Sequence, residues 1–196
     1  MSAAAEPAFT VPLSRAMRRA GLRGAMAQVR LEGDILVLGG DGGGTLALVP
    51  GDVTCIRIAS YPGRHRPTGY ETRIWRRQAS GSLAIVPMNH AMGGYGPVMR
   101  RFAGWVFADG GSVLRGPSLP ALLFQMAWTV GGIALIALLL LGGAIAEGLW
   151  WMWLIVALFA GLAVLLFVGL RRAYWPRRVI RPEQLDEFLP LSEENR

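Results

Sequence analysis

The residue types that most often carry catalysis or bind metals are few in this chain of 196 residues, and they have no motif spacing. Two histidines, His65 and His90, lie in segments containing Gly and Pro, and the single cysteine, Cys55, lies in the apolar context VTCIRI. Metal sites built from local motifs need pairs of such residues a few positions apart, and the sequence has no such pair. We therefore expect no catalytic residue, no metal, no cofactor and no small-molecule substrate, in a protein that is not an enzyme.

A glycine-rich run, GGDGGGT at residues 39–45, has the composition of a phosphate-binding loop. Backbone N–H groups in such a run can bind anions. The run lacks the Gly-Lys-Ser/Thr ending of a nucleotide-binding loop, and short apolar runs flank it on both sides. These flanks favour a hairpin loop in which glycine supplies positive φ, so we discard a nucleotide site.

Arginine supplies all the basic charge of the chain, which has a formal net charge of +7 and no lysine. Its guanidinium group binds phosphate and carboxylate bidentately. A set of arginines in the N-terminal part is expected to contact an anionic surface: Arg64, Arg66, Arg73, Arg76 and Arg77. Whether that surface is nucleic acid, lipid or protein depends on where the chain is held, which the apolar segments determine.

An apolar stretch at residues 119–170 contains one formal charge, Glu147. About 20 apolar residues in an α-helix cross the bilayer core of about 30 Å, so the stretch is long enough for two crossings. We expect a transmembrane hairpin at residues 117–171, with helices at about 119–143 and 149–170. A domain tethered beside a membrane meets anionic lipid head groups, so we expect lipid or an acidic protein, and no nucleic acid, as its partner.

The charges around the hairpin predict its orientation. Arg115 precedes the first helix, a group of arginines follows the second, and the turn carries only Glu147, which places both termini in the cytoplasm. The first residues lack the pattern of a cleaved signal peptide. A Lys-free, Ala- and Gly-rich chain is typical of a GC-rich bacterial genome, so we expect the bacterial inner membrane. The expected membrane-interface anchors are Trp150, Trp151, Trp153, Tyr174, Trp175, Arg171, Arg172, Arg177 and Arg178.

Small residues recur in both apolar helices at a spacing of four, as Ala127 with Gly131 and Ala157 with Gly161. Such pairs let transmembrane helices approach closely. They serve either the packing of the hairpin itself or its packing against other integral membrane subunits. Polar content inside the stretch is limited to Gln125, Trp128 and Thr129, which argues against a transporter or pump acting alone.

The part before the hairpin predicts an α+β domain at residues 25–116. From Met26 the pattern has a period of two, with Val29 and Leu31 alternating with polar residues, and further strands are expected in VTCIRIAS, YETRIWRR and SLAIVPM. A final helix is indicated by the spacing of Val98, Phe102 and Val106.

This order of short antiparallel strands and a terminal helix with Trp105 resembles the pleckstrin-homology-like (PH-like) fold over residues 26–107. The resemblance implies a bent antiparallel sheet or barrel closed at one end by the C-terminal helix. Bacterial members of this group are often joined to transmembrane helices, and many are scaffolds. No phosphoinositide site is carried over, because no matching basic motif aligns residue by residue.

Two terminal segments complete the predicted organisation. Residues 1–24 are expected to form a flexible basic arm, lying on an anionic membrane surface or solvated, and residues 172–196 a cytoplasmic tail that is first basic and then acidic. Together these features predict a non-enzymatic accessory or assembly subunit of a larger inner-membrane complex. The alternative is a membrane-anchored module that binds lipid head groups or regulates another protein.

Overall fold

The computed structural model describes residues 7–62, 67–88, 92–147, 150–187 and 189. The chain forms two compact units. Residues Met1–Gly116 and Arg177–Arg196 form the first, called here the α+β unit, and Pro117–Pro176 form the second, called here the helical unit.

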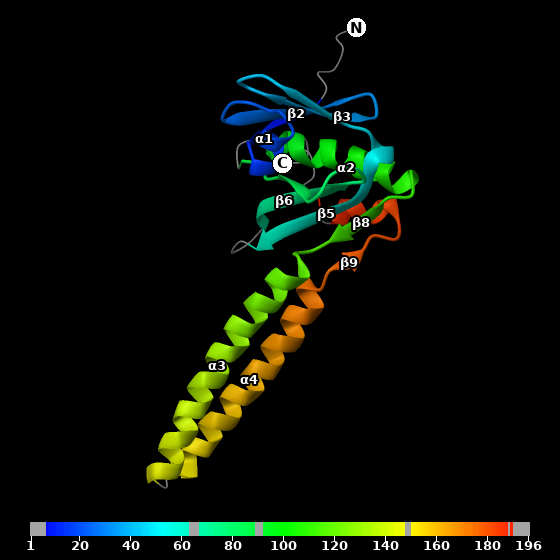
Figure 1. Cartoon of the computed structure of the whole chain (residues 1–196). Coiled ribbons are helices and arrows are strands. Elements are labelled where there is room, and N and C mark those ends of the chain that lie inside the picture. Colours follow the sequence, from blue (N-terminus) through cyan, green and yellow to red (C-terminus); the bar gives the residue numbers. More distant parts are fainter. Residues whose placement is uncertain (1–6, 63–66, 89–91, 148–149, 188, 190–196) are drawn as a thin grey trace. The chain divides into compact units, whose positions relative to one another are not determined.

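Four antiparallel strands form the first sheet of the α+β unit, in the order β1-β2-β3-β4 (Figure 1). They are β1 (Ala8–Pro12), β2 (Met26–Glu32), β3 (Ile35–Gly40) and β4 (Thr45–Leu48). In β2 every second side chain is buried, as the alternation of the sequence predicts, and Val29 lies opposite Leu38 of β3. Gly33 forms the turn between β2 and β3 with a φ of 62°, a conformation that favours glycine.

The second sheet is mixed, in the order β7-β6-β5-β8-β9. Its strands are β5 (Val53–Pro62), β6 (Pro67–Arg76), β7 (Ser82–Ile85), β8 (Ser112–Arg115) and β9 (Arg177–Arg178), and the short 3-10 helix η1 (Pro50–Asp52) precedes β5. Strands β5 and β8 are parallel, whereas every other pair in the described sheet is antiparallel. This differs from the wholly antiparallel sheet that the resemblance implied, because helix α2 carries the chain from β7 to the other side of β5.

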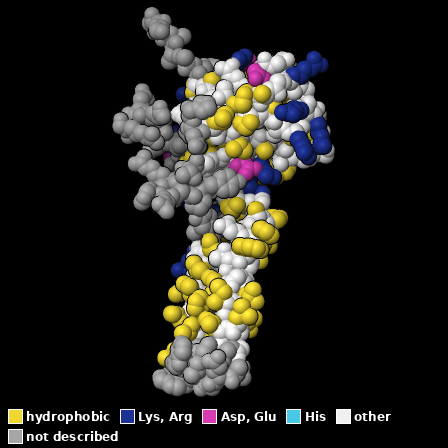
Figure 2. Space-filling view, turned by 90° about the vertical axis from the view of Figure 1, so that its left-hand side faces the viewer, with side chains coloured by type: hydrophobic (Ala, Val, Ile, Leu, Met, Phe, Trp, Pro, Cys, Tyr) yellow, Lys and Arg dark blue, Asp and Glu magenta, His cyan; other side chains and the backbone are white. Residues whose placement is uncertain are grey.

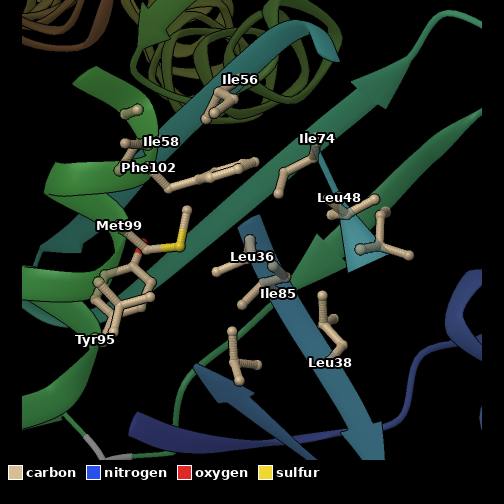
Figure 3. Packing of buried hydrophobic residues seen from close by; sticks show 14 of the residues in the cluster. Leu36, Leu38, Leu48, Ile56, Ile58, Ile74, Ile85, Tyr95, Met99 and Phe102 are labelled. Atoms are coloured by element: carbon tan, nitrogen blue, oxygen red, sulfur yellow. The ribbon is translucent and has the colours of Figure 1, made fainter. Parts of the chain in front are cut away.

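Helix α2 (Met92–Ala108) lies between the two sheets and supplies the centre of the core (Figure 1). The predicted spacing is confirmed, since Val98, Phe102 and Val106 are fully buried. Figure 3 shows Phe102 of α2 beside Ile58 and Ile74 of the second sheet, and Leu36 and Leu38 of the first sheet in the same cluster. Both sheets therefore share one hydrophobic core.

The N-terminal segment differs from the flexible arm expected at residues 1–24. From residue 7 it is part of the α+β unit, because β1 pairs with β2 and the short helix α1 (Arg15–Arg19) buries Met17. Ser14 caps α1 by accepting a hydrogen bond from the Met17 N–H at 3.3 Å. The apolar residues among the arginines explain the difference, since they complete the core: Phe9, Val11, Leu13, Met17 and Leu22.

The C-terminal segment also differs from the separate tail expected at residues 172–196. Strand β9 pairs with β8, and the Val179 N–H donates a hydrogen bond to the Val113 carbonyl at 2.8 Å. The 3-10 helix η3 (Pro182–Glu187) follows, and Val179, Leu185 and Leu189 are buried in the core. Their burial explains why the segment belongs to the α+β unit, which is therefore discontinuous in sequence.

The helical unit consists of α3 (Leu119–Glu147) and α4 (Trp150–Tyr174), packed side by side (Figure 1). Each helix begins within one residue of the predicted start and runs about one turn beyond the predicted C-terminal end. Two segments, Leu119–Gly142 and Trp153–Arg172, are long and apolar enough to cross a membrane.

Candidate functional site

The helical unit buries one narrow stripe on each helix. Most of the less exposed side chains follow a spacing of three or four: Leu122, Met126, Thr129, Ile133, Ala137 and Leu140 on α3, and Ile155, Phe159, Ala163, Leu166 and Leu170 on α4. This spacing is that of a seam between two packed helices. Val130, Leu141 and Val156, each next to one of these residues, are also half-buried. All other faces of both helices are left without a protein partner within the described residues.

The faces outside the seam are apolar and exposed (Figure 2). Phe124 on α3 is 72% exposed and Leu165 on α4 is also 72% exposed. Soluble proteins rarely expose contiguous apolar surface of this length, and helices that are apolar on all sides are typical of membrane spans. The helical unit is therefore suited to a hydrocarbon environment rather than to water.

The ends of α4 carry amphipathic side chains. Trp153 at one end and Trp175 beyond the other are both exposed, and the Arg171 guanidinium lies 5.6 Å from the centre of the Trp175 ring. Tryptophan and arginine place apolar bodies in lipid and polar ends in the head-group region.

Among the other predicted anchors, Arg172 and Arg177 each have an interaction partner, and Arg178 is exposed on β9. The predicted anchors Trp150, Trp151 and Tyr174 have side chains outside the described residues.

The four predicted helix-packing residues, Ala127, Gly131, Ala157 and Gly161, are all exposed. A Cβ atom added at Gly131 or Gly161 would meet nothing within 4 Å outside its own helix backbone. The contact between α3 and α4 therefore does not depend on these two glycines. Their small size remains available to a partner outside the hairpin.

Three of the five predicted anionic-surface arginines lie among the described residues. Arg64 and Arg66 lie outside the described residues, Arg73 is exposed and forms an ion pair with Glu71, and Arg76 is half-buried. Arg77 is exposed, and its backbone N–H donates to the Asp52 carbonyl at 2.8 Å. The charge of Arg73 is thus partly neutralised within the sheet itself.

One basic contact was missed by the sequence reasoning. The Arg57 guanidinium lies 5.1 Å from the centre of the Trp75 ring, on the face of the second sheet that points away from the core. The signal was present, because the alternation of VTCIRIAS and YETRIWRR places Arg57, Arg73 and Trp75 on non-core faces. Arg57 and Trp75 come together because Cys55 of β5 lies opposite Trp75 of β6. This strand register is not encoded in either segment alone.

A second basic surface lies on and just after α1. Its arginines are exposed, and they are Arg15, Arg18, Arg19 and Arg23. The apolar side of this segment, with Met17 and Leu22, is buried in the core. The segment therefore has charge but no free apolar face to insert into lipid, unlike an interfacial amphipathic helix.

The described residues contain no group of three or more His, Cys, Asp or Glu side chains that could hold a metal ion. His65 and His90 lie outside the described residues, and Cys55 is half-buried. The buried polar pair in the core is Thr72 and Tyr95, whose hydroxyl oxygens are 2.7 Å apart. Burial raises the pKa of the Tyr95 hydroxyl, so this pair is neutral and structural.

No protein-family model matches the chain, and comparisons with curated proteins and with solved structures give no match either. Function is therefore inferred from the geometry alone.

Proposed function

We propose that this protein is a non-enzymatic accessory or assembly subunit of a larger bacterial inner-membrane complex. Helices α3 and α4 anchor it as a two-helix hairpin, and the α+β unit lies in the cytoplasm with both termini. The partners are other integral membrane subunits, which pack against the hairpin within the bilayer.

The observation that carries the proposal is the division of the helical unit into one seam and several uncovered apolar faces. The exposed small residues Gly131 and Gly161 add to it, because close backbone approach is a main source of helix association in lipid. Uncovered apolar faces are also what an anchor in lipid needs, so the exposed small residues are the feature that favours protein partners.

The charges at the helix ends support the proposed orientation. Arg115 precedes α3, and Arg171, Arg172 and Arg177 lie at the end of α4 or just beyond it, whereas the acidic Glu147 ends α3 at the opposite end of the hairpin. Positive charge is retained on the cytoplasmic side during insertion. Reporter fusions after Arg196 and within the turn should give cytoplasmic and periplasmic signals respectively.

The α+β unit supports a PH-like scaffold in its element order. Strands β1 to β4 form one antiparallel sheet, β5 to β7 form consecutive antiparallel pairs in the second, and α2 follows. Strands β8 and β9 are then additions at one edge, and they connect the scaffold to the hairpin.

The test is purification of the full-length protein in mild detergent followed by native mass spectrometry. A defined assembly with at least one other integral membrane protein supports the proposal. Substituting Gly161 by Leu should weaken that assembly, whereas Leu162→Phe, at an exposed position about 100° around the helix where the side chain is already large, should not. A protein that purifies without any other membrane protein contradicts the subunit role.

The alternative function, a lipid-head-group-binding module, is favoured by the exposed arginines of α1. The full-length protein in nanodiscs of anionic or neutral lipid distinguishes the two functions. Slower amide hydrogen exchange around α1 in anionic discs, lost at high salt, would support the alternative. Equal exchange in both discs would remove it.

A further inference from the structure

Two polar side chains of α3 face away from the seam. Among the described side chains of α3, Thr129 is half-buried on the seam, whereas Gln125 and Trp128 are exposed, Trp128 to 77%. Because both side chains are exposed, the Gln125 amide and the Trp128 indole N–H have no hydrogen-bond partner on α4. Within the described part of the chain, neither group has a hydrogen-bond partner.

Both groups lie deep in the span. Gln125 and Trp128 follow Leu119 by six and nine positions, which places them about 9 Å and about 14 Å along the helix. This depth rests on the proposed membrane insertion of α3. With Leu119 at the edge of a hydrocarbon core about 30 Å thick, where the apolar segment Leu119–Gly142 begins, both groups lie below the interfacial region where tryptophan is usually found. An amide or N–H group without a hydrogen-bond partner is costly there.

Gln125 and Trp128 share one side of α3 with two small residues. Ala121, Gln125, Trp128 and Gly132 are spaced by four, three and four, which keeps them on one side of α3, and all four are exposed. A Cβ atom added at Gly132 would meet nothing within 4 Å outside its own helix backbone. The Gln125 face, defined by these four residues, therefore combines polar groups with room for another helix to approach closely.

We propose that the Gln125 face binds the Gln125 face of a second copy of this chain. A glutamine amide both donates and accepts hydrogen bonds, so two Gln125 side chains related by a two-fold axis satisfy each other. Lipid tails offer neither donor nor acceptor. The protein thus enters its complex as a pair joined through α3.

Disulfide cross-linking of the full-length protein in native membranes tests this pairing. In a Cys55→Ser background, single cysteines are placed on the Gln125 face (Ala121→Cys, Trp128→Cys and Gly132→Cys). The matched controls are Ala134→Cys and Leu138→Cys, which are exposed on α3 but outside the face. Covalent dimers should form at least tenfold more at the face positions. Equal dimer yields at all positions, or adducts with a different protein in place of dimers at the face positions, would overturn the proposal.

Association of the reconstituted protein, measured by energy transfer between labelled copies, gives a second readout. Gln125→Leu should weaken the dimer roughly three- to tenfold, in the range measured for hydrogen bonds between helices in membranes. Gly132→Leu should weaken it further, while Ala134→Leu, which adds similar bulk off the face, should leave it unchanged. Unchanged association in Gln125→Leu contradicts the role of the amide.

Alkaline carbonate extraction separates the two proposals. Wild type and all variants should remain in the membrane pellet. Extraction of the wild type into the soluble fraction would overturn the membrane anchor, and the pairing with it. Face-cysteine variants that stay in the membrane pellet but form no cross-linked dimer would overturn the pairing alone.

Discussion

Tyr95 and Thr72 illustrate how a single polar contact is accommodated in the core of the α+β unit. Both side chains are fully buried, and the Tyr95 ring packs edge-to-face on Phe9 with 5.4 Å between ring centres. The aromatic contact holds the ring, so the Tyr95 hydroxyl reaches Thr72 on β6 and joins the helix to the second sheet.

We predict that Tyr95→Phe lowers the free energy of unfolding by about 1–3 kcal/mol, because it leaves the buried Thr72 hydroxyl without its partner. Denaturant unfolding of the detergent-solubilised protein, followed by near-UV circular dichroism, measures this loss. The double variant Thr72→Val with Tyr95→Phe should be less destabilised than the sum of the single variants. Additive losses would contradict the hydrogen bond.

Burial of Tyr95 should also make the stability of the protein depend on pH. Burial raises the pKa of Tyr95 above the ordinary value of 10.0, partly offset by its hydrogen bond with Thr72. The folded protein therefore keeps this proton where the unfolded chain releases it, so stability is intact below pH 10.0 and falls as the pH rises above it. Unfolding midpoints measured across this value should show a decline that is smaller in Tyr95→Phe. Burial also raises the pKa of Tyr70, so part of the decline should remain in that variant.

At the scale of elements, strands with a strict alternation were predictable and segments without one were not. Strand β2 shows period two over its whole length, and its partner β3 follows after a glycine turn. By contrast, β8 has only four residues, and the glycine-containing stretch around it has the composition of a linker. Its parallel pairing with β5 depends on α2 carrying the chain across, which no local pattern encodes.

The two terminal segments were mispredicted for a related reason. Each has only a few apolar residues, separated by Arg or by acidic residues, so neither shows a stripe long enough to indicate a buried element. Met17 and Leu185 acquire their burial from the core around α2. The Arg57–Trp75 contact on the candidate surface likewise required the register of β5 and β6.

Leu185 provides the test for the C-terminal element. The side chain is 1% exposed, so Leu185→Ala should lower the free energy of unfolding by about 2–5 kcal/mol through loss of burial and a residual cavity. The neighbouring Glu183→Ala, at an exposed position, should change it by less than about 0.5 kcal/mol. Denaturant unfolding of both variants in the same detergent provides the comparison, and equal stability would contradict docking of η3.

At the scale of the whole molecule, the α+β unit is one domain interrupted by the hairpin. Strands β8 and β9 are antiparallel neighbours in which Arg115 lies opposite Arg177. The chain therefore leaves the sheet and re-enters it at adjacent positions. A fragment that ends at Gly116 lacks Val179, Leu185 and Leu189, and exposes the apolar surface that they cover.

We predict that a two-residue Asn-Gly turn can replace residues 116–176, because it joins Arg115 to Arg177 as an ordinary β-hairpin. The product should be soluble, monomeric by size-exclusion chromatography and cooperative in thermal unfolding. The matched control is the fragment 1–116, which should aggregate or unfold without cooperativity. Equal behaviour of the two proteins would show that the C-terminal segment is dispensable to the domain.

The interruption also has a consequence for biosynthesis. Between the last residue of the first part, Gly116, and the first of the second, Arg177, lies the whole helical unit, Pro117–Pro176. At about 5–20 residues per second, its translation takes roughly 3–12 s. Throughout that time the nascent domain has an uncovered patch on its core and cannot reach its final fold. The cytoplasmic part of the protein therefore matures only after both apolar helices have been made, which couples its folding in time to the delivery of the chain to the membrane.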